Sequence, residues 1–175
     1  MSREAVLGRV RSALGRQPGQ PPSGLPEVYL RVPEMDKESR IARFAEKFEA
    51  LAGKFHRVRD SAAALAFVTE YLAGREAVAS NSAYLMATGI PALANVRTGF
   101  RTPQELKPVC ASAAVGISSA DYALAETGTL VMISSPEESR LISLLPPAHV
   151  AVVPASRLLV NLDEVLTRIP RPGDK

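Results

Sequence analysis

Cysteine is almost absent from this chain of 175 residues, because Cys110 is the single one. An internal disulfide is therefore excluded, and so is a cysteine-rich zinc or iron–sulfur site built by this chain alone. Tryptophan is missing and aromatic residues make up 5% of the chain. The formal net charge is only +3, and the basic residues are scattered along the sequence. Without a basic stripe or interleaved aromatic residues, we do not expect nucleic-acid binding.

Long apolar runs are also missing. Residues 77–96 carry no charge, but polar residues, a glycine and a proline interrupt them, so no membrane span is expected. The N-terminus lacks the apolar core of a secretory signal. Residues 1–16 are rich in arginine like a transit peptide, although Val6, Val10 and Leu14 at helical spacing favour an ordinary surface helix. We therefore expect a soluble, cytoplasmic protein.

The common nucleotide-binding and hydrolase motifs do not occur. The sequence contains no Gly-x-Gly-x-x-Gly, no Gly-x-x-x-x-Gly-Lys and no Gly-x-Ser-x-Gly. The two histidines, His56 and His149, lack the spacing of metal ligands. We expect no metal site.

Short apolar segments alternate with helical segments in the rest of the chain. Strands are expected at residues 55–59, 76–80, 93–97, 113–118, 129–134 and 150–154. Helices are expected at residues 2–15, 36–54, 61–72, 81–88, 104–107 and 162–169, with Ser2, Ser61 and Asn161 as N-caps and Pro170 ending the last one. This alternation predicts an α/β fold with a mostly parallel central sheet, which includes residues 129–134 and 150–154, and helices on both faces.

Three parts are expected along the chain. Residues 1–16 form an N-terminal helix, and residues 17–33 form an extended arm that contains several prolines, Pro22 and Pro26 among them. Residues 34–175 form a single α/β domain. In such a domain ligands bind at the carboxyl ends of the strands, so functional residues are sought in the loops that follow strands.

Glu126 is the only charged residue between Asp121 and Glu137. A carboxylate among apolar residues must be paired, hydrogen-bonded or raised in pKa. The residues that follow it form Thr-Gly-Thr, whose backbone N–H groups are able to approach a ligand; the alternative is a tight turn in which Glu126 accepts hydrogen bonds from backbone amides. Arg140 is the nearby cation, with solvated pairing to Glu137 as its alternative. The candidate site residues are Glu126 as the catalytic group and Asp121, Thr127, Gly128, Thr129, Arg140 and Ser143 as ligand contacts.

These segments carry a family resemblance. Residues 116–131 (GISSADYALAETGTLV) resemble the central signature of lactate utilization protein C. Residues 140–154, which include RLISLLP and VAVVP, are similar to the second block of that family, and residues 3–16 are similar to its opening helix. The match is specific from residue 116 to residue 154 and loose from residue 17 to residue 110.

The resemblance implies a three-layer α/β sandwich, similar to ribose-5-phosphate isomerases, glucosamine-6-phosphate deaminases and coenzyme A transferases. It also implies membership of a three-part system that oxidises L-lactate to pyruvate, in which separate partner proteins carry the iron–sulfur clusters. This chain alone is then expected to bind no cofactor. Class I coenzyme A transferases carry a nucleophilic glutamate in Ser-Glu-Asn-Gly, and residues 125–128 (AETG) are similar to that motif.

Two hypotheses therefore stay open. In the first, the chain is an accessory subunit of a lactate-oxidising complex, which binds its iron–sulfur partners and a small anionic ligand. In the second, it is a stand-alone enzyme that acts on a small anionic substrate through Glu126. No histidine or lysine lies beside Glu126 in the sequence, which favours the first hypothesis. The sequence leaves open whether the chain forms a homo-oligomer.

Overall fold

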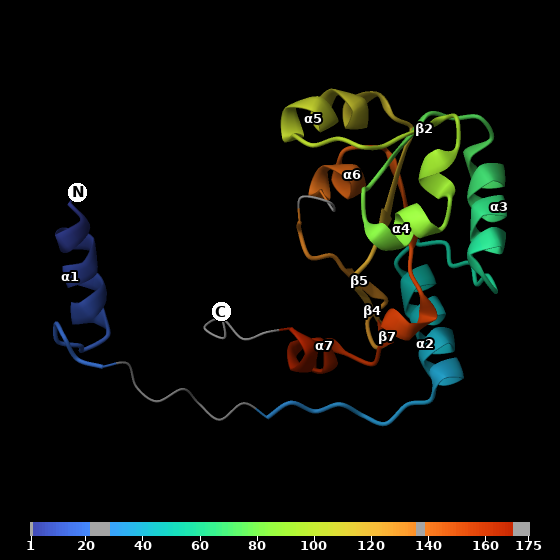
Figure 1. Cartoon of the computed structure of the whole chain (residues 1–175). Helices are drawn as coiled ribbons and strands as arrows, with labels where there is room; N and C mark the ends of the chain where they lie inside the picture. The colour runs from blue at the N-terminus through green and yellow to red at the C-terminus, as the bar shows by residue number, and fades with distance from the viewer. Residues whose placement is uncertain (1, 22–28, 136–138, 170–175) are drawn as a thin grey trace. The chain divides into compact units, whose positions relative to one another are not determined.

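The computed structural model describes residues 2–21, 29–135 and 139–169 (Figure 1). The chain divides into two compact units, Met1–Leu30 and Arg31–Lys175. Pro22, Pro26, Glu137 and Pro170, which the sequence analysis used, lie outside the described residues.

The first unit contains one helix, α1 (Arg3–Ala13), among its described residues. The Ser2 hydroxyl accepts a hydrogen bond from Ala5 N at 3.3 Å, so the predicted N-cap is confirmed. Val6, Val10 and Leu14 lie on this helix or at its end, and all three are exposed.

The central sheet of the second unit has four strands in the order β2-β1-β3-β6, and every neighbouring pair is parallel. Its strands are β1 (Ala77–Ala79), β2 (Val96–Arg97), β3 (Val115–Ser119) and β6 (Ala148–Val152). All five residues of β3 are buried. The predicted parallel sheet is confirmed, with β6 in place of the strand expected at residues 150–154.

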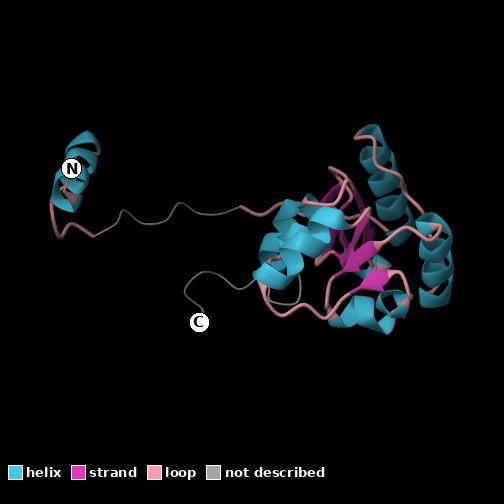
Figure 2. Ribbon diagram, turned by 90° about the horizontal axis from the view of Figure 1, so that it is seen from above, coloured by secondary structure: helices cyan, strands magenta, loops and turns pink. Residues whose placement is uncertain are grey.

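Helices cover both faces of this sheet (Figures 1 and 2). On one face, α3 (Ser61–Leu72) packs Val68 and Leu72 against the strand residues whose side chains share that face. On the other face, α5 (Pro103–Ser112) and α6 (Arg140–Leu144) pack against Val78. Alternate residues of a strand point to opposite faces, which is why β1 contributes to both cores. The three-layer arrangement is therefore confirmed.

A second, smaller sheet lies beside the first, in the order β5-β4-β7. Its strands are β4 (Tyr122–Leu124), β5 (Thr129–Val131) and β7 (Leu158–Leu159). Helix α2 (Lys37–Ala50) packs Ile41 and Phe44 against Ala123 and Leu158 on one face of this sheet. Helix α7 (Leu162–Arg168) packs Val165 against its other face, through Leu124 and Leu159. The small sheet is thus held between two helices of its own.

The remaining elements are the short helices α4 (Ala83–Ala87), η1 (Ile90–Ala92) and η2 (Ala155–Arg157). They follow β1, α4 and β6, respectively, in the chain. The predicted cap of α7 is confirmed, since Asn161 Oδ1 accepts from Glu164 N at 3.1 Å. The cap of α3 is Asp60, not the predicted Ser61, because Asp60 Oδ1 accepts from Ala63 N at 2.8 Å.

Two strand predictions are wrong. Residues 55–59 form no strand. Residues 129–134 do not belong to the central sheet: β5 ends at Val131 and lies at the edge of the small sheet, antiparallel to β4. The physical reason is that a tight turn at residues 125–128 reverses the chain directly after β4, so that β5 pairs with its neighbour in sequence. Among the described residues, no helix has the length and apolar character that crossing a membrane requires.

Candidate functional site

Glu126 lies in the turn between β4 and β5. The start of this turn is fixed to the segment at β7, because Ala125 N donates to Leu159 O and Glu126 N donates to Val160 O, both at 2.9 Å. The Glu126 side chain itself is exposed, and no described residue donates a hydrogen bond to its carboxylate. The apolar surroundings inferred from the sequence are therefore wrong, and so is the alternative in which Glu126 accepts from backbone amides. Its catalytic role stays a prediction.

Glu126 lines a pocket of about 690 Å³ on the second unit. The other lining residues are Arg31, Val32, Pro33, Asn161, Leu162 and Asp163. Two hydrogen bonds of 2.8 Å hold the chain here: Arg31 N donates to Asp163 Oδ2, and Asn161 Nδ2 donates to Arg31 O. The Arg31 guanidinium forms no ion pair with a described residue. Arg31, which no sequence pattern singled out, is therefore the cation that lines this pocket together with Glu126.

Gly128 brings the turn against helix α2. Its φ angle is +67°, and a Cβ atom built on it would lie 2.5 Å from Phe48 N and 2.7 Å from the carbonyl carbon of Lys47. Its own N–H donates to Leu124 O. The glycine thus permits a close approach, but the approach is to a helix of the same chain. Binding of a ligand by Gly128 stays a prediction.

The neighbouring threonines are exposed. Their hydroxyls, Thr127 Oγ1 and Thr129 Oγ1, lie 2.8 Å apart and form one hydrogen bond across the turn. Asp121 precedes β4, and its Oδ2 accepts from Ile133 N at 2.6 Å, which holds the segment after β5 beside β4. Each of these side chains has a local structural partner, and none of the three lines the Glu126 pocket.

Arg140 and Ser143 lie on α6, which packs against β3 and β6 of the central sheet. Ser143 Oγ donates to Arg140 O at 3.1 Å. Neither residue lines the pocket around Glu126. The pocket lining therefore does not bring these two predicted ligand contacts together with Glu126, and their contacts with a ligand stay predictions.

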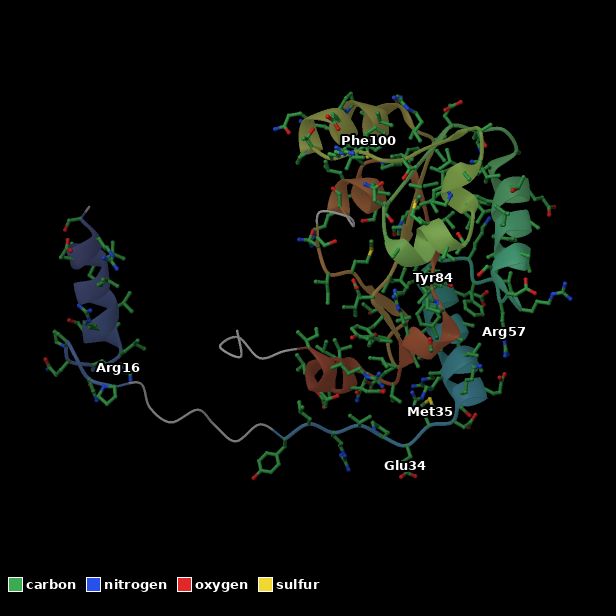
Figure 3. The ribbon with its side chains drawn as sticks, in the orientation of Figure 1. Arg16, Glu34, Met35, Arg57, Tyr84 and Phe100 are labelled. Carbon is green, nitrogen blue, oxygen red and sulfur yellow. The ribbon has the colours of Figure 1, made fainter. Side chains whose placement is uncertain are left out.

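Sequence reasoning missed a cluster at the carboxyl ends of β1, β3 and β6. Ser82 Oγ lies 2.9 Å from Ser119 Oγ, and Arg157 Nη1 donates to Ala120 O at 3.0 Å. The Arg157 guanidinium carbon lies 5.4 Å from the centre of the Tyr84 ring, which Figure 3 marks beneath α4. A usable signal existed, since ligands of parallel sheets bind at carboxyl ends and the predicted strand at residues 76–80 is followed by Asn-Ser.

Two other titratable groups are enclosed by the fold. His149 Nε2 lies 2.7 Å from the Oγ of Ser118, a fully buried residue, and burial lowers the pKa of His149. Glu164 is 8% exposed and accepts hydrogen bonds from Val160 N and Arg168 Nη2, both at 2.8 Å. Burial raises the pKa of Glu164, but these hydrogen bonds and the nearby arginines outweigh it, so the net shift is downward. Both groups have partners that account for them structurally.

No set of three or more histidine, cysteine, aspartate or glutamate side chains suited to a metal ion occurs in the described part of the chain. Cys110 lies on α5 and is fully buried. Burial also raises the pKa of its thiol. Cys110 is therefore part of the core between α5 and the central sheet.

Comparisons with known proteins agree on one family. Residues 41–173 match the LUD domain. Lactate utilization protein C from an Exiguobacterium species is 27% identical over 179 residues, which cover 96% of this chain and 76% of that protein. Lactate utilization protein C from Halalkalibacterium halodurans is 43% identical over 51 residues, and this alignment spans only 22% of that protein. The crystal structure of a DUF162 family protein from Deinococcus radiodurans is similar to this chain, with a TM-score of 0.65 and 16% identity. The match covers 77% of this chain and 80% of that protein's chain.

Proposed function

The chain belongs to the LUD domain family, and from this membership we propose that it is a subunit of a lactate utilization system that supports the oxidation of L-lactate to pyruvate. The observation that carries the proposal is the match over nearly the whole chain to a relative named lactate utilization protein C. The resemblance inferred from residues 116–154 points to the same family.

The electron-transfer chemistry of this system is proposed to lie on separate iron–sulfur proteins. An iron–sulfur cluster normally takes four protein ligands, mostly cysteine thiolates. This chain offers only Cys110, whose side chain is enclosed between α5 and the central sheet. The role proposed for the chain is to bind these partners and a small anionic ligand.

A second candidate function is a stand-alone enzyme with a fold like that of coenzyme A transferases. The observation that favours it is the exposed Glu126 carboxylate in the same pocket as Arg31. A solvent-accessible glutamate is able to attack an acyl group, and an arginine that lines the same pocket attracts an anionic substrate. If this function holds, the Glu126 carboxylate attacks the carbonyl of a coenzyme A thioester and displaces the coenzyme A thiolate. The thiolate then attacks the Glu126 carbonyl and releases the free carboxylate, which leaves a glutamyl–coenzyme A thioester detectable by mass spectrometry of peptides.

Growth on L-lactate as the sole carbon source tests the main proposal. Deletion of the gene is expected to abolish growth, and the wild-type gene is expected to restore it. Affinity purification of the restored protein is expected to recover iron-containing partners. Growth of the deletion strain at the wild-type rate contradicts the proposed function.

The role of Glu126 is tested in the same strain with Glu126→Gln. This carboxylate is exposed and accepts no hydrogen bond from a described residue. The free energy of unfolding of the variant is therefore expected to lie within about 0.5 kcal/mol of the wild-type value. It is nevertheless expected to fail in restoring growth. The matched control is Glu70→Gln, at an exposed position of α3, which is expected to restore growth fully. Full growth with Glu126→Gln means that the site assignment is wrong.

A further inference from the structure

The strand order creates a switch point in the central sheet. After β1 the chain passes to β2 on one side, and it then crosses to β3 on the other side. The loops that follow β1 and β3 therefore leave in opposite directions, and open α/β sheets bind ligands at such places. We infer that this chain binds a small organic carboxylate at the carboxyl ends of β1 and β3, between Ser82, Ser119 and Arg157, at a site separate from the Glu126 pocket.

Hydroxyl groups form one side of this site. Ser119 is the last residue of β3 and is 5% exposed, whereas Ser82 follows β1 and is half-buried. Their Oγ atoms are 2.9 Å apart, and Ser82 Oγ also accepts long hydrogen bonds from Ser80 Oγ at 3.5 Å and from Leu85 N at 3.4 Å. Hydrogen bonds of 3.4–3.5 Å are weak, so a ligand hydroxyl group is able to replace one of them at Ser82, which lies at the solvent boundary.

Arg157 forms the other side of the site and comes from η2, after β6. It donates from Nη1 to Ala120 O and lies over the Tyr84 ring, so its position is held by two contacts. Ala120 adjoins Ser119, and Tyr84 lies two residues after Ser82, which places the guanidinium and the hydroxyl pair at the same end of the sheet. No described residue accepts a hydrogen bond from Arg157 Nε or Nη2, and none forms an ion pair with it.

This arrangement suits a carboxylate. A guanidinium offers two parallel N–H groups that match the two oxygens of a carboxylate, and it stays charged at every physiological pH. Asp121 is the acidic residue nearest to Ser119 along the chain, and its Oδ2 accepts a hydrogen bond from Ile133 N. A single cation neutralises a monoanion, and the Ser82 hydroxyl is able to bond a hydroxyl group on the ligand. A 2-hydroxy acid has both groups, and the choice of L-lactate as the probe rests on the proposed function.

Titration of the whole purified chain with L-lactate tests this inference, with ¹H–¹⁵N NMR spectra as the readout. We expect saturable shifts of the amides of Ser82, Ser119 and Arg157. Arg157→Gln is expected to weaken binding at least about ten-fold, because the charge and the fork are both lost. Propionate, which lacks only the 2-hydroxyl group, is expected to bind more weakly than L-lactate. Tighter binding of inorganic phosphate than of either carboxylate overturns the assignment to carboxylates.

The matched control is Arg75→Gln. Arg75 also lies over a tyrosine ring, Tyr71, and also donates to backbone carbonyls, but it precedes β1 and so lies at the amino end of that strand. The Arg75→Gln variant is expected to bind L-lactate as tightly as wild type. If Arg157→Gln does not fold, Arg157→Lys replaces it. Binding is again expected to weaken, but by less than with Arg157→Gln, because lysine keeps the charge and lacks only the fork.

Absence of saturable binding by wild type, or unchanged binding by the folded Arg157 variant, overturns the inference. These outcomes are distinguishable from failure of the proposed function. A deletion strain that cannot grow on lactate, together with a chain that binds no carboxylate, refutes the site alone. Saturable binding at Ser82 and Ser119, together with normal growth of the deletion strain, refutes the lactate function alone.

Discussion

Replacement of Gly128 by alanine tests whether this glycine is required by the packing of the turn against α2. Two costs add at this position. The φ angle of +67° costs a residue with a Cβ about 1 kcal/mol. The new methyl group would also lie 2.5 Å from Phe48 N, and overpacking of this kind costs about 1–3 kcal/mol. The expected loss in the free energy of unfolding is therefore about 2–4 kcal/mol, a large part of the total for a small domain.

Two control variants separate these costs. Gly74→Ala has a φ angle of +80° but no atom within 4 Å of the new Cβ, so it carries the backbone cost alone. Gly116→Ala has no positive φ angle, but its Cβ would lie 1.8 Å from Ile142 O, so it carries the steric cost alone. The assay is equilibrium unfolding in urea followed by circular dichroism, with the midpoint compared at constant m-value. If Gly128→Ala loses no more stability than Gly74→Ala, the contact with α2 does not explain the glycine.

Two further predictions concern buried groups. Glu164→Gln is expected to lose about 2 kcal/mol, because Val160 N and Arg168 lose a charged acceptor. The pKa of Glu164 is lowered in the folded state. The contribution of Glu164 to the free energy of unfolding is therefore complete above the unfolded pKa near 4.5, and it is lost as the pH falls through the folded pKa. The difference in urea midpoint between wild type and Glu164→Gln should therefore shrink below pH 4.5, and a constant difference contradicts this account. Cys110 is fully buried with a raised thiol pKa, so a thiol reagent should label it only as fast as the chain opens, and rapid labelling of the folded chain refutes this.

The helices and the buried strands were largely predictable because their signals are local. Helix α2 repeats apolar residues such as Ile41 and Phe44 at helical spacing, and Asn161 caps α7 through its own backbone neighbours. The strand β3 is a continuous uncharged run, as expected for a strand buried on both faces. The segment at residues 129–134, in contrast, was assigned to the wrong sheet. Its apolar run suggested a buried strand, whereas the glycine at the end of the preceding four-residue turn is typical of a hairpin.

The environment of Glu126 was not predictable, because isolation of a charge in the sequence says nothing about isolation in space. Its apolar neighbours Ala125 and Leu124 point into the cores on either side of the small sheet, and the turn leaves the carboxylate in solvent. Glu164 has the enclosed environment that was expected for Glu126, although Asp163 and Arg168 make its surroundings in the sequence look polar. The face of a helix or strand on which a residue lies decides whether the residue is buried. The periodicity of apolar residues along the element is therefore a better guide to burial than the local density of charged residues.

The cluster at the switch point depends on contacts between segments far apart in the chain. Ser82 and Ser119 are 37 residues apart, and the same separation divides Ala120 from Arg157. Taken alone, Ser82 is a loop serine, Ser119 is the last residue of a strand and Arg157 is one arginine among many. They meet because β1 and β3 are parallel neighbours and because η2 follows β6 on the other side of β3. The carboxyl ends of parallel strands share one edge, so loop residues after three predicted strands belong to one candidate site even where no motif connects them.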